Sequence, residues 1–348
     1  MLSDMIHTYM ERCLELGKIA GKDTKSNPMV GSLIIAGDRI IGEGFHRKYG
    51  NKHSEIESFE SVKASDRHLI SGATMFVSLE PCTHHGKTPP CADRIIREGI
   101  KKVVVSCEDP NPVVFREGIK RLRDHGIEVI VGVQASKGEE LLRIFKKSLL
   151  KRPYIILKVV QSSDGFIGST RRQIWMSNKY IRMITHKWRS EIDGIMIGKQ
   201  TALTDNASLT TRLWPGDNPT RIVWDSNLEI PPTFNIFKDV APTIILNHHK
   251  NMVDKHLTFK NVIDMNLDDV TTYLYQEGIC RLMVEGGSKT INHFLENDLW
   301  DEARIVTTSC RIKDEENEGL VRASDVFGKL IFQENYFGDD LKIYKKQT

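Results

Sequence analysis

The residues best suited to chemistry lie in the first third of the chain, where one histidine and two cysteines are spaced as metal ligands are. His53 is followed two residues later by Glu55, and Cys82 and Cys91 enclose eight residues. One imidazole and two thiolates fill three sides of a tetrahedron and leave the fourth for water, which is the ligand count of a catalytic zinc site. We therefore predict that His53, Cys82 and Cys91 bind Zn2+.

Glu55 is the carboxylate that such a site needs. Zinc lowers the pKa of its bound water to about 7, and a carboxylate that is not a ligand must then move protons between that water and the substrate. Zinc deaminases show H-x-E followed by P-C-x-x-C, whereas the two cysteines here are further apart, so that pattern fits in part. Two alternatives stay open: His84 and His85 are competing ligands, and cysteines at this spacing also occur as plain core residues.

Alternating strands and helices would position these residues in an α/β layered domain. Proline ends the last helix of the first half at Pro153, and we place the domain boundary there, with domains at 1–150 and 151–348. We expect helices at 4–20, 91–99, 117–125 and 138–150, and strands at 30–36, 40–45, 73–79, 102–106 and 127–131.

The second half repeats this alternation. Gly286 and Gly287 lie between a strand and a helix, where free backbone N–H groups and the helix dipole favour a phosphate. The pattern is not G-x-G-x-x-G, so a Rossmann fingerprint is absent, and such a turn can also be purely structural. We expect strands at 154–160, 194–197, 221–224, 243–246 and 281–284, and helices at 179–190 and 288–297.

Composition agrees with two globular domains and disfavours several classes of protein. The 348 residues are 40% hydrophobic and 27% charged, and domains average roughly 150 residues. A net charge of +3 disfavours nucleic-acid binding by bulk charge. No apolar stretch is long enough to span a membrane, and the N-terminal residues lack the apolar core of a signal peptide, so we expect a cytoplasmic protein.

The six cysteines are too sparse for a disulfide framework in a chain of this length. In a reducing compartment, clustered cysteines are better explained as metal ligands or a reactive thiol. Cys82 and Cys91 form the one clustered pair, and we expect the other four to be core residues. These four are Cys13, Cys107, Cys280 and Cys310.

Around the proposed metal ligands, the sequence resembles the deaminases of riboflavin biosynthesis. The segment CTHHGKTPPC at 82–91 is similar to their zinc loop, and NPMVG at 27–31, GFHRK at 44–48 and DPNP at 109–112 agree with it. The resemblance implies a cytidine-deaminase-like α/β/α domain that deaminates 2,5-diamino-6-ribosylamino-4(3H)-pyrimidinone 5′-phosphate. It also implies a set of substrate contacts, for each of which a turn or capping role is the alternative. These are Asn27, His46, Lys87, Asp109 and Asn111.

The second half resembles the reductase half of the same family, through KVVQSSDG at 158–165, WMS at 175–177, GKQTALTD at 198–205, SLTTR at 208–212, RIVWDS at 221–226 and VEGG at 284–287. This implies a dihydrofolate-reductase-like α/β domain that uses NADPH to reduce the ribosyl group to a ribityl chain. The implied cofactor contacts are Trp175, Thr201, Asp205 (also catalytic), Ser226, Gly287 and Ser288; the implied substrate contacts are Arg189, Leu209, Arg212 and Glu285.

Alternatives accompany two of these assignments, and the chain departs from the family at five places; two of these are Ser162-Ser163-Asp164-Gly165 in place of Ser-Leu-Asp-Gly, and the missing Pro-x-x-x-Gly pattern after Thr308. Arg189 would otherwise lie on a solvated helix face, and Trp175 would be a core aromatic residue. Ser54 replaces an alanine, residues 113–117 replace a glycine-containing turn, and Asn206-Ala207 replaces Asp-Pro.

Both halves therefore predict a bifunctional enzyme of riboflavin biosynthesis with Zn2+ and NADPH as cofactors. We expect it to bind a small phosphorylated pyrimidine as substrate and to bind neither nucleic acid nor a membrane. We also expect it to form a homo-oligomer. One alternative is a zinc deaminase of another nucleobase-type substrate with a degenerate reductase-like domain. Another is a zinc-stabilised interaction protein, which Glu55 argues against because a structural zinc needs no free carboxylate.

Overall fold

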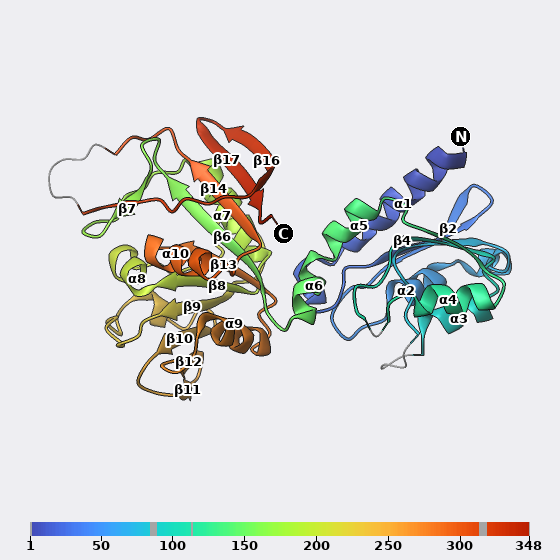
Figure 1. Ribbon diagram of the computed structural model, residues 1–348, viewed down its shortest axis with the longest axis horizontal. Coiled ribbons are helices and arrows are strands. Elements are labelled where there is room, and N and C mark those ends of the chain that lie inside the picture. Colours follow the sequence, from blue (N-terminus) through green and yellow to red (C-terminus); the bar gives the residue numbers. More distant parts are fainter. Residues whose placement is uncertain (1, 84–88, 113, 313–318, 348) are drawn as a thin grey trace. The chain divides into compact units, whose positions relative to one another are not determined.

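The computed structural model describes residues 2–83, 89–112, 114–312 and 319–347. The chain forms two compact units, Met1–Leu150 and Lys151–Thr348. Each unit is a β-sheet with helices packed against it (Figure 1). None of the helices in these described ranges is both long enough and apolar enough to span a bilayer.

The first unit is built on a five-stranded sheet with the strand order β2-β1-β3-β4-β5. β1 pairs antiparallel with β2 and β3, whereas β3, β4 and β5 run parallel to one another. The strands are β1 (Gly31–Ala36), β2 (Arg39–Phe45), β3 (Thr74–Leu79), β4 (Lys102–Cys107) and β5 (Glu128–Val131). The carboxyl ends of β3 and β4 therefore lie side by side, and the segments that follow them are neighbours.

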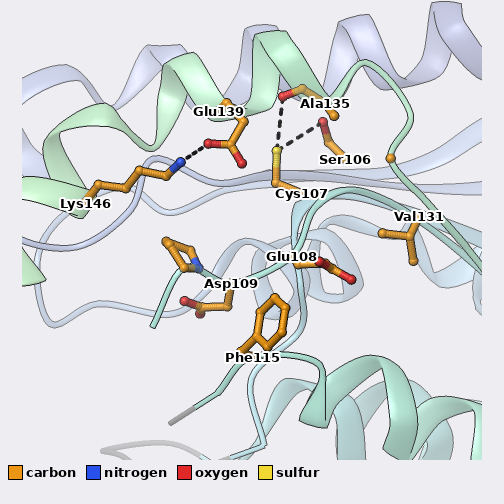
Figure 2. Close-up of a pocket in the computed structure, with 11 residues that line it drawn as sticks. Ser106, Cys107, Glu108, Asp109, Phe115, Val131, Ala135, Glu139 and Lys146 are labelled. Carbon is orange, nitrogen blue, oxygen red and sulfur yellow. Dashed lines mark hydrogen bonds and ion pairs between the residues drawn. The ribbon is translucent and has the colours of Figure 1, made fainter. Parts of the chain in front are cut away.

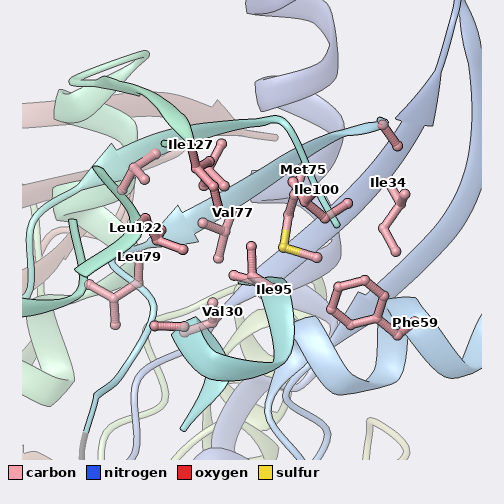
Figure 3. Close-up of a cluster of buried hydrophobic side chains, with 14 of the residues drawn as sticks. Val30, Ile34, Phe59, Met75, Val77, Leu79, Ile95, Ile100, Leu122 and Ile127 are labelled. Carbon is pink, nitrogen blue, oxygen red and sulfur yellow. The ribbon is translucent and has the colours of Figure 1, made fainter. Parts of the chain in front are cut away.

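Helices cover both faces of this sheet (Figure 1). Side chains alternate between the faces, as they must along a strand: Phe76 packs against α1, whereas Met75 and Val77 pack in the cluster that includes α2, α3 and α4 (Figure 3). The helices are α1 (Leu2–Ile19), α2 (Ser54–Ser61), α3 (Cys91–Arg97), α4 (Glu117–Asp124), α5 (Ala135–Leu141) and α6 (Arg143–Leu149), with 3-10 turns at Gly21–Thr24 and Ala64–Leu69.

The second unit has a ten-stranded sheet with the order β11-β12-β10-β9-β8-β13-β6-β14-β17-β16. The seven strands from β12 to β14 are parallel, and β11, β17 and β16 are antiparallel additions at the edges. The strands are β6 (Tyr154–Gln161), β8 (Gly194–Gly198), β9 (Thr220–Trp224), β10 (Thr243–Asn247), β11 (Met252–Asp254), β12 (Leu257–Asn261), β13 (Arg281–Gly286), β14 (Glu302–Thr307), β16 (Lys329–Tyr336) and β17 (Asp339–Lys345).

In the described part of this unit, four helices accompany the sheet, and a separate two-stranded sheet joins β7 to β15. Residues of α9 and α10 share one apolar cluster with alternate residues of β6, such as Ile155 and Leu157. The remaining elements are α7 (Lys179–Ser190), α8 (Lys199–Asp205), α9 (Leu267–Gln276), α10 (Ser288–Glu296), β7 (Phe166–Ser169), β15 (Leu320–Arg322) and a 3-10 turn at Asn235–Phe237.

The α/β class expected for both halves is confirmed, and the helix expected at 179–190 has those bounds. The single helix expected at 138–150 is wrong, because α5 and α6 are separated at Leu142. The break lets Leu141 and Leu142 enter two different core clusters. Cys13, Cys107 and Cys280 are buried as expected, whereas Cys310 is half-buried and not a core residue.

Candidate active sites

The three proposed metal ligands of the first unit converge. His53 Nδ1 lies 3.5 Å from Cys82 Sγ and 3.3 Å from Cys91 Sγ, and the ligand atoms of all three residues lie within 4.8 Å of one another. Tetrahedral zinc with ordinary Zn–N and Zn–S bonds implies nitrogen-to-sulfur separations of about 3.6 Å. The three side chains therefore fit a zinc ion as they stand.

Each ligand is placed at the end of an element. Cys82 follows β3, His53 immediately precedes α2, and Cys91 is the first residue of α3. The Cys91 backbone N–H donates to Cys82 Sγ at 3.4 Å. Hydrogen bonds from Cys91 and His53 outweigh burial and lower the pKa of Cys82 to about 4, which favours the thiolate that binds metal.

Glu55 lies in the first turn of α2 with only 4% of its surface exposed. Its Oε2 accepts a hydrogen bond from Ser54 Oγ at 3.1 Å, so the serine that replaces the family's alanine has a polar partner. Burial raises the pKa of Glu55 above its ordinary value. A carboxyl group with a raised pKa is suited both to take up and to release a proton near neutral pH.

Asn27 and His46 lie beside this cluster. His46 Nδ1 is 2.9 Å from the Lys52 carbonyl, which assigns the proton to Nδ1. His46 Nε2 then accepts from Asn27 Nδ2 at 3.1 Å. The His46 ring meets the His53 ring edge-on, with centroids 5.9 Å apart, and burial lowers the pKa of His46 and so favours the neutral form. The structure thus brings these two predicted substrate contacts to the metal ligands.

Asp109 and Asn111 form a turn directly after β4. Asp109 Oδ1 accepts the Asn111 backbone N–H at 2.8 Å, so the turn role considered for these residues is present. Asp109 also lines a cavity of about 430 Å³ together with Phe115 and Lys146 (Figure 2). The zinc ligands are not among the residues that line it. Lys87, His84 and His85 lie outside the described residues.

In the second unit, parallel pairing brings five of the six proposed cofactor residues to the carboxyl ends of neighbouring strands. β9, β8, β13 and β6 are neighbours and run in the same direction, so the segments after their carboxyl ends gather there, as in other open α/β sheets. Ser226 follows β9, Thr201 and Asp205 belong to α8 after β8, and Gly287 and Ser288 follow β13.

Thr201 packs directly against the glycine turn. A Cβ atom at Gly287 would lie 3.0 Å from Thr201 Oγ1, and the Gly287 φ of +67° is one that side chains disfavour. Gly287 precedes the first turn of α10, where backbone N–H groups can receive a phosphate. The Ser288 hydroxyl donates to the Arg322 carbonyl at 2.5 Å.

Two predicted substrate contacts bind each other. Arg189 donates from Nε to Glu285 Oε1 at 3.0 Å and from Nη2 to Oε2 at 2.8 Å, and the two side chains are 12% and 7% exposed. The alternative of a solvated helix face for Arg189 is therefore wrong. Lys158 Nζ lies 3.6 Å from the same carboxylate. Burial favours a protonated Glu285, but the charges of Arg189 and Lys158 outweigh it and hold the Glu285 pKa at about 2.

The turn that contains Leu209 joins this cluster to Arg212. The Thr210 carbonyl accepts from Arg189 Nη1 at 3.2 Å, and Thr210 Oγ1 accepts from Arg212 Nη1 at 2.6 Å. Leu209 is buried with a φ of +52°, a left-handed conformation that costs a non-glycine residue about 1–2 kcal/mol. The four predicted substrate contacts of this unit thus belong to one assembly around Thr210.

His186 supports the same turn. Its Nδ1 accepts the Arg212 backbone N–H at 2.9 Å, so this nitrogen must be unprotonated. Burial and the charges of Arg189 and Arg212 lower the pKa of His186 to about 4, against the opposing charge of Glu285.

The second unit is expected to lose stability as the pH falls from about 6.5 to about 4. In this window the unfolded chain binds a proton at His186 that the folded unit excludes, so acid favours unfolding. Above about pH 6.5, His186 is neutral in both states and no longer changes the free energy of unfolding with pH. All five tryptophans lie in the second unit, so tryptophan fluorescence can follow its urea unfolding at neutral and acid pH. The variant His186→Asn should show a smaller pH dependence, and an equal one would contradict this assignment.

The remaining reductase residues differ in their surroundings. Burial raises the pKa of Asp205, against the opposing charge of Lys158. Trp175 is 68% exposed, so the alternative of a core aromatic residue is wrong; the Arg182 guanidinium lies 5.9 Å from its ring centroid. The Ser226 carbonyl accepts the His248 backbone N–H at 2.9 Å.

Sequence reasoning missed Lys158 and His186 as parts of these sites. Lys158 had a usable signal, because it is a charged residue inside a segment that is otherwise apolar. Such residues are rarely buried unless they are paired. His186 had no comparable signal, since its partner, the Arg212 N–H, is set by the tertiary fold.

Comparison with known families agrees with this geometry. Residues 3–107 match the zinc-binding region of the cytidine and deoxycytidylate deaminases, and residues 153–312 match the RibD C-terminal domain. Fold and site together define a two-domain enzyme in which a zinc-binding deaminase precedes a reductase.

The chain belongs to the RibD family and is a bifunctional deaminase and reductase of riboflavin biosynthesis. It is 37% identical over 315 residues to the riboflavin biosynthesis protein RibD of Aquifex aeolicus, across 88% of this chain and 87% of that protein. It is 31% identical to RibD of Escherichia coli, across 90% and 89% of the two chains. The family and the two activities expected from the sequence are confirmed.

Solved structures support the fold over the whole chain. The deaminase/reductase of Thermotoga maritima superposes with a TM-score of 0.87 at 33% identity and full coverage of both chains. RibD of Acinetobacter baumannii superposes with a TM-score of 0.84 at 26% identity, across 99% of this chain and 100% of that one.

Proposed function

We propose that Glu55 is the proton carrier of the deaminase and that His53, Cys82 and Cys91 hold its zinc. The convergence of these three ligands beside a buried carboxyl group supports this assignment most directly. Zinc bound there supplies hydroxide at neutral pH. Glu55 takes the proton from the attacking water and delivers it to the ring nitrogen beside the carbon under attack. It then transfers the remaining water proton, from the hydroxyl group now on the ring carbon, to the amino group; the C–N bond breaks, ammonia leaves and the ring carbon becomes a carbonyl.

The pyrimidine would be held by the polar residues around the metal ligands. Neutral His46 keeps Asn27 oriented through its Nε2 acceptor, which leaves the Asn27 carbonyl oxygen to read a pyrimidine edge. Asp109 and Asn111 would contact the substrate from the turn after β4, and Lys87 would meet its phosphate as a point charge. The substrate we propose is the diaminopyrimidinone ribosylamino 5′-phosphate, which agrees with the diaminohydroxyphosphoribosylaminopyrimidine deaminase activity named for the Thermotoga maritima protein.

In the second unit, NADPH would lie across the carboxyl ends of the parallel strands. NADPH supplies the hydride that converts the ribosyl group to a ribityl chain. The turn at Gly287 and Ser288 would receive a cofactor phosphate, with Thr201 packed beneath it, and Trp175, Asp205 and Ser226 would complete the contacts. Leu209, Arg212, Arg189 and Glu285 would position the substrate, and buried Lys158 lies beside them.

The variant Gly287→Ala is expected to raise the KM for NADPH about tenfold. The added methyl group would press on Thr201 Oγ1 and so displace the turn whose backbone N–H groups would receive the phosphate; a binding loss of roughly 1.4 kcal/mol corresponds to a factor of ten. NADPH oxidation at varied NADPH concentration measures the effect. Gly278→Ala is the matched control, because Gly278 also has a positive φ of 83° and lies in the turn after α9. An equal KM in both variants would exclude a cofactor contact at Gly287.

The assignment of both activities is tested in one reaction. The full-length protein is given the ribosylaminopyrimidine 5′-phosphate and NADPH, and ammonia release and NADPH oxidation are followed separately. Both should proceed, and a zinc chelator should stop ammonia release while added deaminated substrate still oxidises NADPH. If no NADPH is oxidised, the protein is a deaminase with a degenerate reductase-like domain.

We also propose that the protein forms a homo-oligomer through its second unit. β16 is the edge strand of the large sheet, and Leu330, Ile331 and Phe332 on it are 39–45% exposed. An apolar edge strand favours pairing with another chain. Sedimentation equilibrium measures the state, and a monomer would contradict the proposal.

A further inference from the structure

A buried carboxylate outside both catalytic clusters binds the backbone of the segment that carries Asp109. Glu80 is 3% exposed. Its Oε2 accepts the backbone N–H groups of Asp109 at 3.1 Å and Arg116 at 3.0 Å. Its Oε1 accepts those of Gly118 at 2.9 Å and Ile119 at 3.2 Å. One side chain thus satisfies four donors on both sides of a turn.

The chain is shaped to allow this contact. A Cβ atom at Gly118 would lie 2.0 Å from the Pro81 carbonyl oxygen and 3.1 Å from Glu80 Cγ, so the first turn of α4 can dock here because residue 118 is glycine. The Glu80 backbone N–H in turn donates to the Cys107 carbonyl at 2.9 Å. Hydrogen bonds of Glu80 therefore connect the carboxyl ends of β3 and β4 with the start of α4.

Glu80 connects two parts of the proposed deaminase site, the zinc-ligand segment and the turn that begins at Asp109. Glu80 precedes the zinc ligand Cys82 by two residues, and the backbone it binds begins at Asp109, beside Asn111. Hydrogen bonds to an ionised carboxylate are stronger than those between neutral groups, and both of its oxygens can accept. Together with the pairing of β3 and β4, Glu80 thus links the zinc-ligand segment to the Asp109–Asn111 turn.

We propose that Glu80 is a positioning residue for deamination, which holds the substrate turn at 109–111 in register with the zinc-ligand segment. The inference rests on the proposed function, because that function assigns Asp109 and Asn111 to the substrate. A glutamine at this position keeps the shape but presents an NH2 group to two of the four donors, so the turn loses part of its anchor while the neighbouring packing is retained.

The test compares E80Q with E108Q in the full-length protein. Glu108 lies in the same segment but accepts only side-chain bonds from Arg116, at 2.8 and 3.4 Å, among the described contacts. We expect E80Q to raise the deaminase KM about tenfold or more with a nearly unchanged kcat, the signature of lost substrate binding. Zinc content and reductase activity should match the wild type. E108Q should match the wild type in every measurement.

Gly118→Ala supplies a second variant, because it displaces α4 from Glu80 without removing the carboxylate. It should show the same rise in KM. An unchanged KM in both variants would overturn the proposal, and so would a loss of zinc with a proportional fall in kcat, since that pattern indicates a purely structural role. If the wild-type protein itself releases no ammonia from the substrate, the proposed function fails instead.

Discussion

Glu55→Gln is expected to lower the deaminase kcat by about 10²–10⁴-fold, the usual contribution of a positioned acid–base group. Glutamine fills the same space beside Ser54 Oγ but cannot take a proton from water or return one to the leaving amine. Bound zinc should stay at the wild-type level, because the candidate metal ligands are His53, Cys82 and Cys91 and do not include Glu55. Ammonia release under substrate saturation measures the loss, and zinc analysis of the same sample measures the metal.

Glu57→Gln is the matched control for this experiment. Glu57 lies two residues further along α2 and pairs with Arg47 at 3.0 Å on the surface, where an ion pair contributes about 0–1 kcal/mol. It should deaminate normally. NADPH oxidation with the deaminated substrate should be unchanged in both variants. Ammonia release at the wild-type rate by Glu55→Gln would show that another group carries the proton.

The metal ligands could be predicted from the sequence because their signal is chemical and local. Cysteine and histidine at these spacings, with a free glutamate two residues after the histidine, have few other uses. His46 and Asn27 could be named as substrate contacts only through the resemblance. Their mutual hydrogen bond, and the Lys52 carbonyl that sets the His46 tautomer, depend on how the chain returns to the site after β2.

The reductase site could be predicted less well because its key contacts join distant segments. Arg189 and Glu285 are 96 residues apart and meet only when α7 packs beside β13. Their predicted shared role as substrate contacts did not reveal that they neutralise each other. Asn206, which replaces an aspartate of the family, adopts a left-handed conformation at the end of α8 and binds Asn235 through both its side chain and its carbonyl. This departure therefore has a structural use that spacing alone could not show.

The elements missed in the second unit have weak local patterns. β16 is exposed along nearly all of its length, so its residues lack the alternation of buried and exposed positions that identifies a strand. The helix α9 begins with a capping box between Asn266 and Asp269. That pair is present in the sequence and indicates the start of a helix.

Glu285→Gln is expected to destabilise the second unit by about 3–5 kcal/mol, the cost of removing one partner from a buried ion pair. The carboxylate compensates both Arg189 and Lys158 in a region where these side chains are 12% exposed. Without it, two cations lie close together in a low-dielectric setting. Tryptophan fluorescence during urea unfolding reports the second unit alone, because the first unit contains no tryptophan. The unfolding midpoint should fall clearly, while ammonia release by the first unit persists.

Reduction should also be lost in this variant, and a second substitution separates the two effects. Adding Lys158→Met to Glu285→Gln removes one uncompensated charge, so part of the stability should return, but NADPH oxidation should not. Glu191→Gln is the control, since Glu191 pairs with Lys187 at 3.9 Å on the exposed surface at the end of α7. If Glu285→Gln unfolds at the wild-type urea concentration, the carboxylate does not compensate these cations. If stability returns together with full activity in the double variant, the cluster serves folding and takes no part in placing the substrate.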